Sequence, residues 1–309
     1  MLNAVRKILV QVDSAAGVNP ALDRALQLAG QVGASVKIVD AADRLPRHAR
    51  LALPEAMQSV LLGDRQSGLG ALAARAAESA PPGVAVTAEL LRGQPAIAVV
   101  REVLRHGHDL VLRSRTIRGG EPAYDAVGMQ LFRKCPCPVL LVGVHATRRR
   151  RVLAAVAPNP DDPVEQTLNR KILELTVFLA EKEGHEPHVL HVWEPFGEEL
   201  LKSHTTEAEV EAYIEAARQT ARAELDEVLA PFTGRIAGAH VHLERGEPGA
   251  FIPDFVGRHG IDLVVMGSVA RTGIAGFVMG NTAEHVLSSL TCSVLAVKPD
   301  GFECPVRLE

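Results

Sequence analysis

Short runs of branched aliphatic residues alternate along the chain with longer segments whose apolar residues recur every three or four positions. Unbroken apolar runs are typical of parallel strands buried on both faces, and the wider spacing is typical of helices that cover a sheet. In the first half, the predicted strands fall at 6–12, 35–40, 84–90, 109–112 and 138–143, and the predicted helices at 20–32, 56–79, 95–106 and 124–134. The pattern predicts an α/β fold with a parallel sheet.

The second half repeats this order of elements. Its predicted strands fall at 151–157, 187–193, 239–244, 262–266 and 293–298, and its predicted helices at 163–183, 206–230, 249–259 and 280–290. Thr206 and Glu209 have the spacing of a capping box at the start of one of these helices. We expect its apolar stripe to pack along the sheet; the stripe comprises Val210, Ile214, Ala217, Ala221, Leu225 and Val228.

Specific motifs return at a fixed distance, which indicates an internal duplication. Gly93 and Gly246 each stand between an arginine and a proline two residues on, and Asp109 and Asp262 each open an apolar strand; both pairs are 153 residues apart. This period is far above that of solenoid repeats, so each copy is long enough to bury its own core. We therefore predict two similar domains, with a boundary between residues 147 and 148 (1–147 and 148–309).

Composition places the chain in the ordinary globular range and excludes some partners. Its 309 residues are 47% hydrophobic and 23% charged, with a formal net charge of −4. This charge gives no general attraction to nucleic acid or to an anionic membrane, and we interpret the single basic run at 148–151 as a linker. With four cysteines, no leader-like start and no apolar run of 18 residues, the sequence predicts a cytoplasmic protein without a membrane segment.

A glycine-bearing loop after the strand ending at Met266 is the candidate site. Such a loop, between the carboxyl end of a strand and the start of a helix, presents free backbone N–H groups to an anion. Ser268, Asn281 and Thr282 add side-chain donors, and Arg271 adds positive charge. The alternative is a loop whose glycines only permit turns, and composition alone does not decide between the two.

These residues resemble a known family. The G-x2-G-x9-G-[ST]-like loop, the G-x-P turn before it, the Asp-Leu-Val-Val-Met-Gly run at 262–267 and the Cys-Pro-Val run at 137–139 are similar to motifs of the universal stress proteins. Residues 280–284 and the ending at 297–302 resemble, more narrowly, the tandem E-type members. The resemblance implies two Rossmann-like five-stranded parallel sheets of the adenine nucleotide alpha hydrolase-like fold. It also implies an internal pseudo-dimer whose last strands, 138–143 and 293–298, meet in a mixed sheet.

The resemblance also implies a site that binds the phosphates of a nucleotide such as ATP, and the second copy keeps part of it. Gly267 and Gly280 stand where the first and last loop glycines belong. Ala270 replaces the middle glycine, and Asn281 replaces the usual serine or threonine. A methyl group at 270 is expected to hinder close approach of the backbone to phosphate.

On the adenine side, the family's acidic residue matches Asp13 in the first copy. In the second copy the equivalent place is Ala157, with Asn159 two residues on. In the first copy's loop, Ser114 and Asp125 stand in place of the two glycines, and an aspartate there is expected to repel phosphate. We interpret the first copy's loop arginines as solvated rather than anion-binding; they are Arg113, Arg115 and Arg118.

The sequence indicates neither a metal site nor a catalytic centre. His240 and His242 point to one face of a predicted strand, but no third ligand is visible near them in the sequence. The Cys135 and Cys137 pair has no further ligand at metal-binding spacing. No nucleophile, base and orienting residue can be arranged together, so we predict no enzymatic activity, leaving only slow ATP hydrolysis open.

Two hypotheses of function remain. In the first, the protein acts in stress adaptation by binding a small phosphate-bearing molecule, ATP being one candidate, in its second copy. In the second, it is an interaction scaffold that binds a protein partner and needs no nucleotide. The sequence leaves open whether two tandem chains associate into a homodimer.

Overall fold

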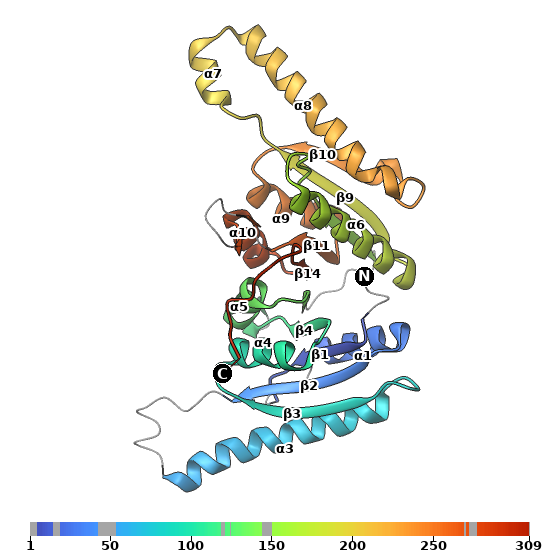
Figure 1. Ribbon diagram of the computed structural model, residues 1–309, viewed down its shortest axis with the longest axis vertical. Coiled ribbons are helices and arrows are strands. Elements are labelled where there is room, and N and C mark those ends of the chain that lie inside the picture. Colours follow the sequence, from blue (N-terminus) through green and yellow to red (C-terminus); the bar gives the residue numbers. More distant parts are fainter. Residues whose placement is uncertain are drawn as a thin grey trace.

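One ten-stranded sheet runs through the whole protein (Figure 1). The computed structural model describes residues 5–14, 19–42, 54–118, 121–123, 125–143, 150–268, 270–271 and 277–308. The strand order is β10-β9-β8-β11-β14-β7-β4-β1-β2-β3, so each copy contributes five adjacent strands. Within each copy the strands are parallel, as predicted.

The first copy follows its predicted elements closely. Its strands are β1 (Lys7–Gln11), β2 (Ser35–Ala42), β3 (Val86–Arg92), β4 (Leu110–Ser114) and β7 (Val139–Val142). Its helices are α1 (Pro20–Val32), α3 (Glu55–Ser79), α4 (Pro95–His106) and α5 (Ala126–Lys134). Proline in the first turn of α1 and α4, and a left-handed glycine after each, fit the sequence preferences of helix ends.

The second copy repeats this arrangement. Its strands are β8 (Arg151–Ala155), β9 (Glu186–Trp193), β10 (Val241–Arg245), β11 (Leu263–Gly267) and β14 (Ser293–Val297). Its helices are α6 (Pro163–Glu183), α8 (Glu207–Leu229), α9 (Pro248–His259) and α10 (Asn281–Ser289). The periodicity did not predict helix α7 (Glu198–His204), or the two short hairpins formed by β5 (Ile117–Arg118) with β6 (Glu121–Pro122) and by β12 (Ala270–Arg271) with β13 (Phe277–Val278).

The two copies are joined through their last strands, as the family resemblance implied. Strands β7 and β14 pair antiparallel, with Leu140 opposite Leu295. The join continues beyond the strands, because the backbone N–H of Gly143 donates to the Ser293 hydroxyl at 3.0 Å. The tail after β14 crosses onto the first copy, where Cys304 Sγ lies 3.2 Å from the carbonyl oxygen of Lys134. The result is a mixed sheet across both copies.

Two hydrophobic cores lie on opposite faces of the sheet, and both extend through the two copies. Side chains of α1, α3, α6 and α8 cover one face, and those of α4, α5, α9 and α10 cover the other. Successive strand residues alternate between them, so Ile8 and Val10 belong to one core and Leu9 to the other. This double burial explains why the strands appear in the sequence as unbroken apolar runs.

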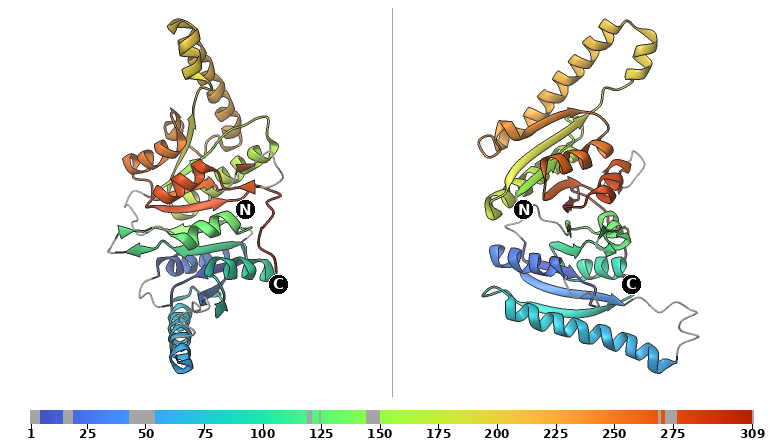
Figure 2. Two further views of the ribbon diagram at one scale, coloured as in Figure 1. Left: turned by 90° about the vertical axis from the view of Figure 1, so that its left-hand side faces the viewer. Right: turned by 180° about the vertical axis from the view of Figure 1, so that it is seen from behind.

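The predicted capping box of α8 is confirmed, but the packing of its whole stripe along the sheet is not. Thr206 Oγ1 accepts the N–H of Glu209, and the Glu209 carboxylate accepts the N–H of Thr206. Only Val210, Ala221 and Leu225 of this helix are buried. Its amino-terminal half projects past the sheet beside α7 (Figures 1 and 2). A 23-residue helix is about 35 Å long, whereas the five-residue edge strand β10 is only about 17 Å long.

Candidate functional site

A cavity of about 310 Å³ opens at the carboxyl ends of β8 and β11 in the second copy. In the sheet, β8 has β9 on one side and β11 on the other. The chain continues from β8 to β9 and reaches β11 only later, so the strand order reverses between β8 and β11, where the cavity lies. Open parallel sheets bind ligands at such points. The lining is largely apolar and comprises Ala155, Val156, Ala157, Glu165, Leu168, Asn169, Ile172, Leu190, Val192, Pro248, Ile252, Met266, Gly267, Gly280 and Ala283.

Two of the predicted loop glycines line this cavity. Gly267 ends β11, and a Cβ atom added there would lie 2.9 Å from Leu168 Cδ2. Gly280 is the N-cap of α10, and its φ of −66° is open to any residue. The first turn of α10 therefore starts at the cavity, with Ala283 in its lining. This end of the helix presents unpaired N–H groups and the positive end of its dipole.

The structure describes only the backbone of the remaining loop residues. Ala270 and Arg271 form β12, which pairs antiparallel with β13. Asn281 and Thr282 are the first two residues of α10. Residues 269 and 272–276 lie outside the described part of the chain. The predicted donors are thus brought to the same end of the sheet as the cavity, on a short hairpin and a helix start.

Ser268 is the predicted donor whose side chain the structure describes, and it is absent from the lining of the cavity. It is fully buried, and its N–H donates to the carbonyl oxygen of Val297 at 3.2 Å. Its hydroxyl accepts a hydrogen bond from Lys298 Nζ at 2.8 Å. No sequence signal predicted this pairing, because Ser268 follows β11 and Lys298 follows β14, 30 residues further along the chain.

Lys298 is a buried cation where the copies meet. Only 6% of the residue is exposed, its Nζ also donates to the carbonyl oxygen of Phe132 in the first copy, and it lies 4.6 Å from the centre of the Phe302 ring. None of the described carboxylates forms an ion pair with it. Burial lowers the pKa of Lys298 to about 7, because the charged form loses its hydration.

On the predicted base side, a helix side chain binds the backbone at position 157. Ala157 lines the cavity, and its backbone N–H and carbonyl bind Asn169 Oδ1 at 3.0 Å and Nδ2 at 2.9 Å. Asn159 does not line the cavity; its amide donates to Glu165 Oε2 at 2.8 Å. Asn169 is 3% exposed and could have been noticed in the sequence as a polar residue within the apolar stripe of helix 163–183.

In the first copy, an ion pair occupies the strand end and the helix start that correspond to those beside the second copy's cavity. Asp125 caps α5 by accepting the N–H of Gly128 at 3.0 Å, and Arg113 Nε lies 3.0 Å from its Oδ2. The Arg113 side chain is 14% exposed and Arg115 is 6% exposed, so the expectation of solvated arginines was wrong for both. The carboxylate draws Arg113 inward, since a buried charge requires a partner. The side chain of Arg118 lies outside the described residues.

The other predicted positions of the first copy also lie apart from a cavity of this kind. Asp13 is exposed after β1. Ser114 ends β4, where its hydroxyl accepts the N–H of Ala21 at 3.0 Å and donates to Asn19 Oδ1 at 3.1 Å. The two copies therefore share a fold, and among the residues that the structure describes, glycines at a strand end and a helix start line a cavity in the second copy.

A parallel α/β sheet with a cavity at its switch point and a glycine-started helix beside it defines a Rossmann-like class of α/β protein. Residues 4–143 and 149–298 each match the universal stress protein family. The chain belongs to this family, with two family domains in tandem.

The curated relatives include proteins of matching length. Universal stress protein E of Escherichia coli (strain K12) is 28% identical over 310 residues, which cover 98% of this chain and 97% of the relative. Universal stress protein E of Photorhabdus laumondii is 27% identical over 309 residues, covering 98% of each chain. The likeness extends over both copies and their join.

Solved structures share the fold over nearly the whole length. A putative universal stress protein from Pseudomonas aeruginosa UCBPP-PA14 has a TM-score of 0.67 at 24% identity, covering 97% of this chain and 95% of that one. A functionally unknown protein from Pseudomonas aeruginosa PAO1 has a TM-score of 0.66 at 23% identity, covering 97% and 94%. Among the helices that the structure describes, none combines the length and the apolar character needed to cross a bilayer.

Proposed function

We propose that this protein is a cytoplasmic tandem universal stress protein that acts in stress adaptation by binding a phosphate-bearing small molecule in its second copy. ATP is the candidate to test first. The observation that carries the proposal is the cavity between Gly267 and Gly280, at the start of α10. Its apolar walls suit a planar base, and the helix start suits an anion.

The same site supports binding rather than turnover. Among the described residues that line the cavity, Glu165 is the only carboxylate, and Asn159 donates to it. No histidine or cysteine belongs to this described lining. A nucleophile and a base within hydrogen-bond reach, the usual requirement for acyl or phosphoryl transfer chemistry, are therefore not brought together at the cavity.

The proposal is tested by replacing Gly280 with valine. Because φ at this position is −66°, the new side chain leaves the backbone conformation accessible and acts by filling the approach to α10. We expect ATP binding, measured by calorimetry on the natively purified protein, to be lost. Ala126→Val is the matched control, since Ala126 is exposed at the equivalent helix start in the first copy. Unchanged affinity in Gly280→Val would overturn the assignment.

The identity of the ligand is tested by mass spectrometry before and after denaturation of the purified protein. A phosphorylated compound at about one per chain, absent from Gly280→Val, is the expected result. An empty protein that also fails to bind ATP would favour the second candidate function.

That second candidate is an interaction scaffold, and the projecting α7–α8 segment favours it. Phe196, just before α7, is 92% exposed and Leu200 within it is 66% exposed, whereas large apolar side chains are usually covered. A scaffold predicts that a stress phenotype survives Gly280→Val and is lost in a Phe196→Ser and Leu200→Ser double variant. The opposite pattern would support ligand binding.

A further inference from the structure

Four histidines and a glutamate gather at the outer edge of the second copy, away from the cavity. Glu186 and His188 lie on β9, His240 ends the short 3₁₀ turn before β10, His242 lies on β10, and His259 ends α9. Strands β9 and β10 are neighbours, so the register places His242 opposite Leu190 and brings His240 beside His188. Glu186 and His188 supply the further ligands that were not visible beside His240 in the sequence.

Three potential ligand atoms converge within this group. Glu186 Oε1, His188 Nε2 and His240 Nε2 all lie within 4.8 Å of one another. The carboxylate oxygen is 2.7 Å from His188 Nε2 and 3.3 Å from His240 Nε2. Ligands of a tetrahedral zinc ion, with bonds of about 2.0–2.2 Å, lie roughly 3.3 Å apart. An ion therefore fits after shifts of less than about 1 Å.

Neighbouring groups support the ligands. His188 Nδ1 lies 3.2 Å from His242 Nε2, and this contact holds the His188 ring with its Nε2 toward Glu186. His240 Nδ1 is buried without a hydrogen-bond partner, and the ring stacks 4.4 Å from that of His188. Arg151 Nε lies 3.4 Å from Glu186 Oε1, while its Nη1 is held by the carbonyl oxygen of His259.

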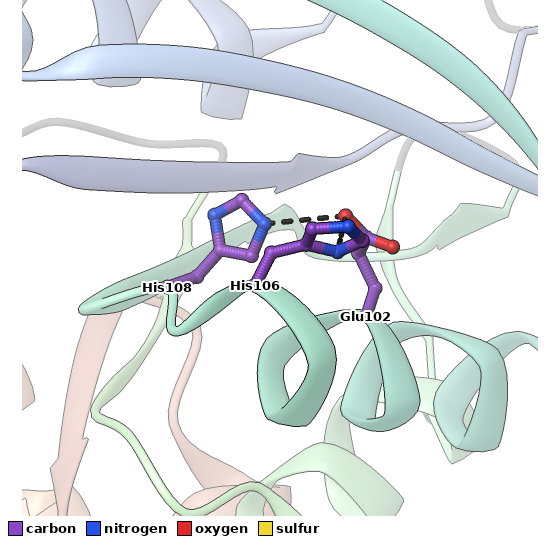
Figure 3. Close-up of side chains that lie close together, drawn as sticks. All are labelled: Glu102, His106 and His108. Carbon is purple, nitrogen blue, oxygen red and sulfur yellow. Dashed lines mark hydrogen bonds and ion pairs between the residues drawn. The ribbon is translucent and has the colours of Figure 1, made fainter. Parts of the chain in front are cut away.

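The first copy holds a related cluster in which a lysine already supplies the cation. Figure 3 shows His106 and His108 pointing to the carboxylate of Glu102. Lys37 Nζ lies 2.6 Å from Glu102 Oε1 and 2.6 Å from Glu89 Oε2. This ammonium group would repel a metal ion at the same oxygen.

Lys37 and His188 occupy corresponding places, since each stands on the second strand of its copy, opposite Leu9 and Leu153 respectively. The second copy thus has an imidazole where the first has an ammonium group. The exchange removes an ammonium group that lies 2.6 Å from the carboxylate and adds a ligand. The cation beside Glu186 Oε1 is Arg151 Nε, which is farther away at 3.4 Å, so the second copy's cluster is the one that suits a metal.

We propose that Glu186, His188 and His240 form a binding site for a first-row transition metal, with His242 positioning His188 and water completing the coordination. Two imidazoles and one carboxylate suit zinc and its neighbours better than magnesium or calcium. A bound ion would tie the start of β9 to the turn before the edge strand β10. It would stabilise the edge of the sheet that carries the α7–α8 segment.

The test uses the tag-free, full-length protein, freed of metal with a chelator and titrated with Zn²⁺ alone. We expect one Zn²⁺ per chain by calorimetry and by elemental analysis after dialysis. Glu186→Gln keeps the side-chain shape, and His240→Ala changes a side chain that is 28% exposed, so both variants are expected to fold. Each should lose Zn²⁺ binding, and His242→Phe should weaken it by about 10- to 100-fold.

His106→Ala in the first copy is the matched control and should leave Zn²⁺ binding unchanged. Co²⁺ replaces Zn²⁺ in a second measurement, in which thiolate-to-metal absorption would assign the ion to the cysteines instead. The proposal is overturned by absence of Zn²⁺ binding, by that thiolate signal, or by unchanged affinity in folded Glu186→Gln and His240→Ala. Circular dichroism of each variant establishes that it is folded.

Discussion

At the scale of single residues, Lys298 shows how burial changes a side chain's chemistry. Its amino group is held by Ser268 and by the Phe132 carbonyl oxygen rather than by a carboxylate. Two hydrogen bonds to neutral groups do not compensate for the lost hydration of a charge, which is why its pKa falls. The residue lies next to the loop of the proposed ligand site, yet it serves the join between the copies.

The shift gives a pH-dependent stability. The folded-state pKa of about 7 lies below the unfolded value of 10.5, so the unfolded chain binds more protons between these pH values. The penalty for burying Lys298 is complete below pH 7 and diminishes as pH rises toward 10.5. We expect the stability of Lys298→Met relative to the native protein to fall by up to about 1.4 kcal/mol per pH unit above pH 7.

Denaturant unfolding at pH 6, 7.5 and 9 measures this difference. Lys202→Met is the control, because Lys202 is 49% exposed and its pKa is raised above 10.5 by Glu198, so both of its titrations lie above pH 9. Lys298→Met lacks the hydrogen bonds of the lysine at every pH, so their loss does not affect the slope of the stability difference against pH. If the stability difference between Lys298→Met and the native protein stays constant over this pH range, the lowered pKa of Lys298 is refuted.

At the scale of elements, the first turn of α8 depends on local interactions more than on packing. Only Val210 is buried in the amino-terminal half of this helix. Thr206→Ala removes the cap, which typically costs about 1 kcal/mol. We expect amide hydrogen exchange at residues 207–213 to become about fivefold faster, with little change in global unfolding, because fraying of this end exposes little core.

Hydrogen exchange followed by mass spectrometry measures this effect. Thr220→Ala, the same change on the same helix, is the control, since the Thr220 hydroxyl only bonds back to the Ala216 carbonyl oxygen at 3.1 Å. Equal exchange in both variants would mean that the capping box does not hold the start of α8.

At the scale of the whole molecule, the continuous cores predict that the two copies unfold together. Gly143 lies at their join, and a Cβ atom added there would be 2.6 Å from the carbonyl carbon of Cys292 and 2.8 Å from the Ser293 nitrogen. Backbone atoms of a paired strand cannot move aside easily. Gly143→Ala should therefore reduce the free energy of unfolding by about 1–3 kcal/mol.

Two signals test this prediction. Fluorescence of Trp193, the single tryptophan, reports on the second copy, and far-ultraviolet circular dichroism reports on both. Both unfolding midpoints should shift to lower denaturant together. Gly63→Ala is the control with the opposite sign, because Gly63 lies exposed inside α3 with open space around it. Separate midpoints in the native protein would show that the copies unfold independently.

The sequence by itself determined the elements and the duplication. Helices 20–32, 95–106 and 163–183 begin and end where the periodicity predicted. Such signals lie within a few residues of the structure they specify, so no tertiary contact is needed to interpret them. The family resemblance added the meeting of β7 with β14.

Only the tertiary structure decided what the candidate side chains do. It turned Ser268 to Lys298, paired Arg113 with Asp125, put Asn169 against Ala157, and gathered the histidines around Glu186. It also left half of α8 beyond the sheet, although the spacing of its apolar residues is regular throughout. Each of these outcomes depends on contacts between different elements or on the area of sheet that a helix can cover. The local pattern of apolar and polar residues contains no information about either.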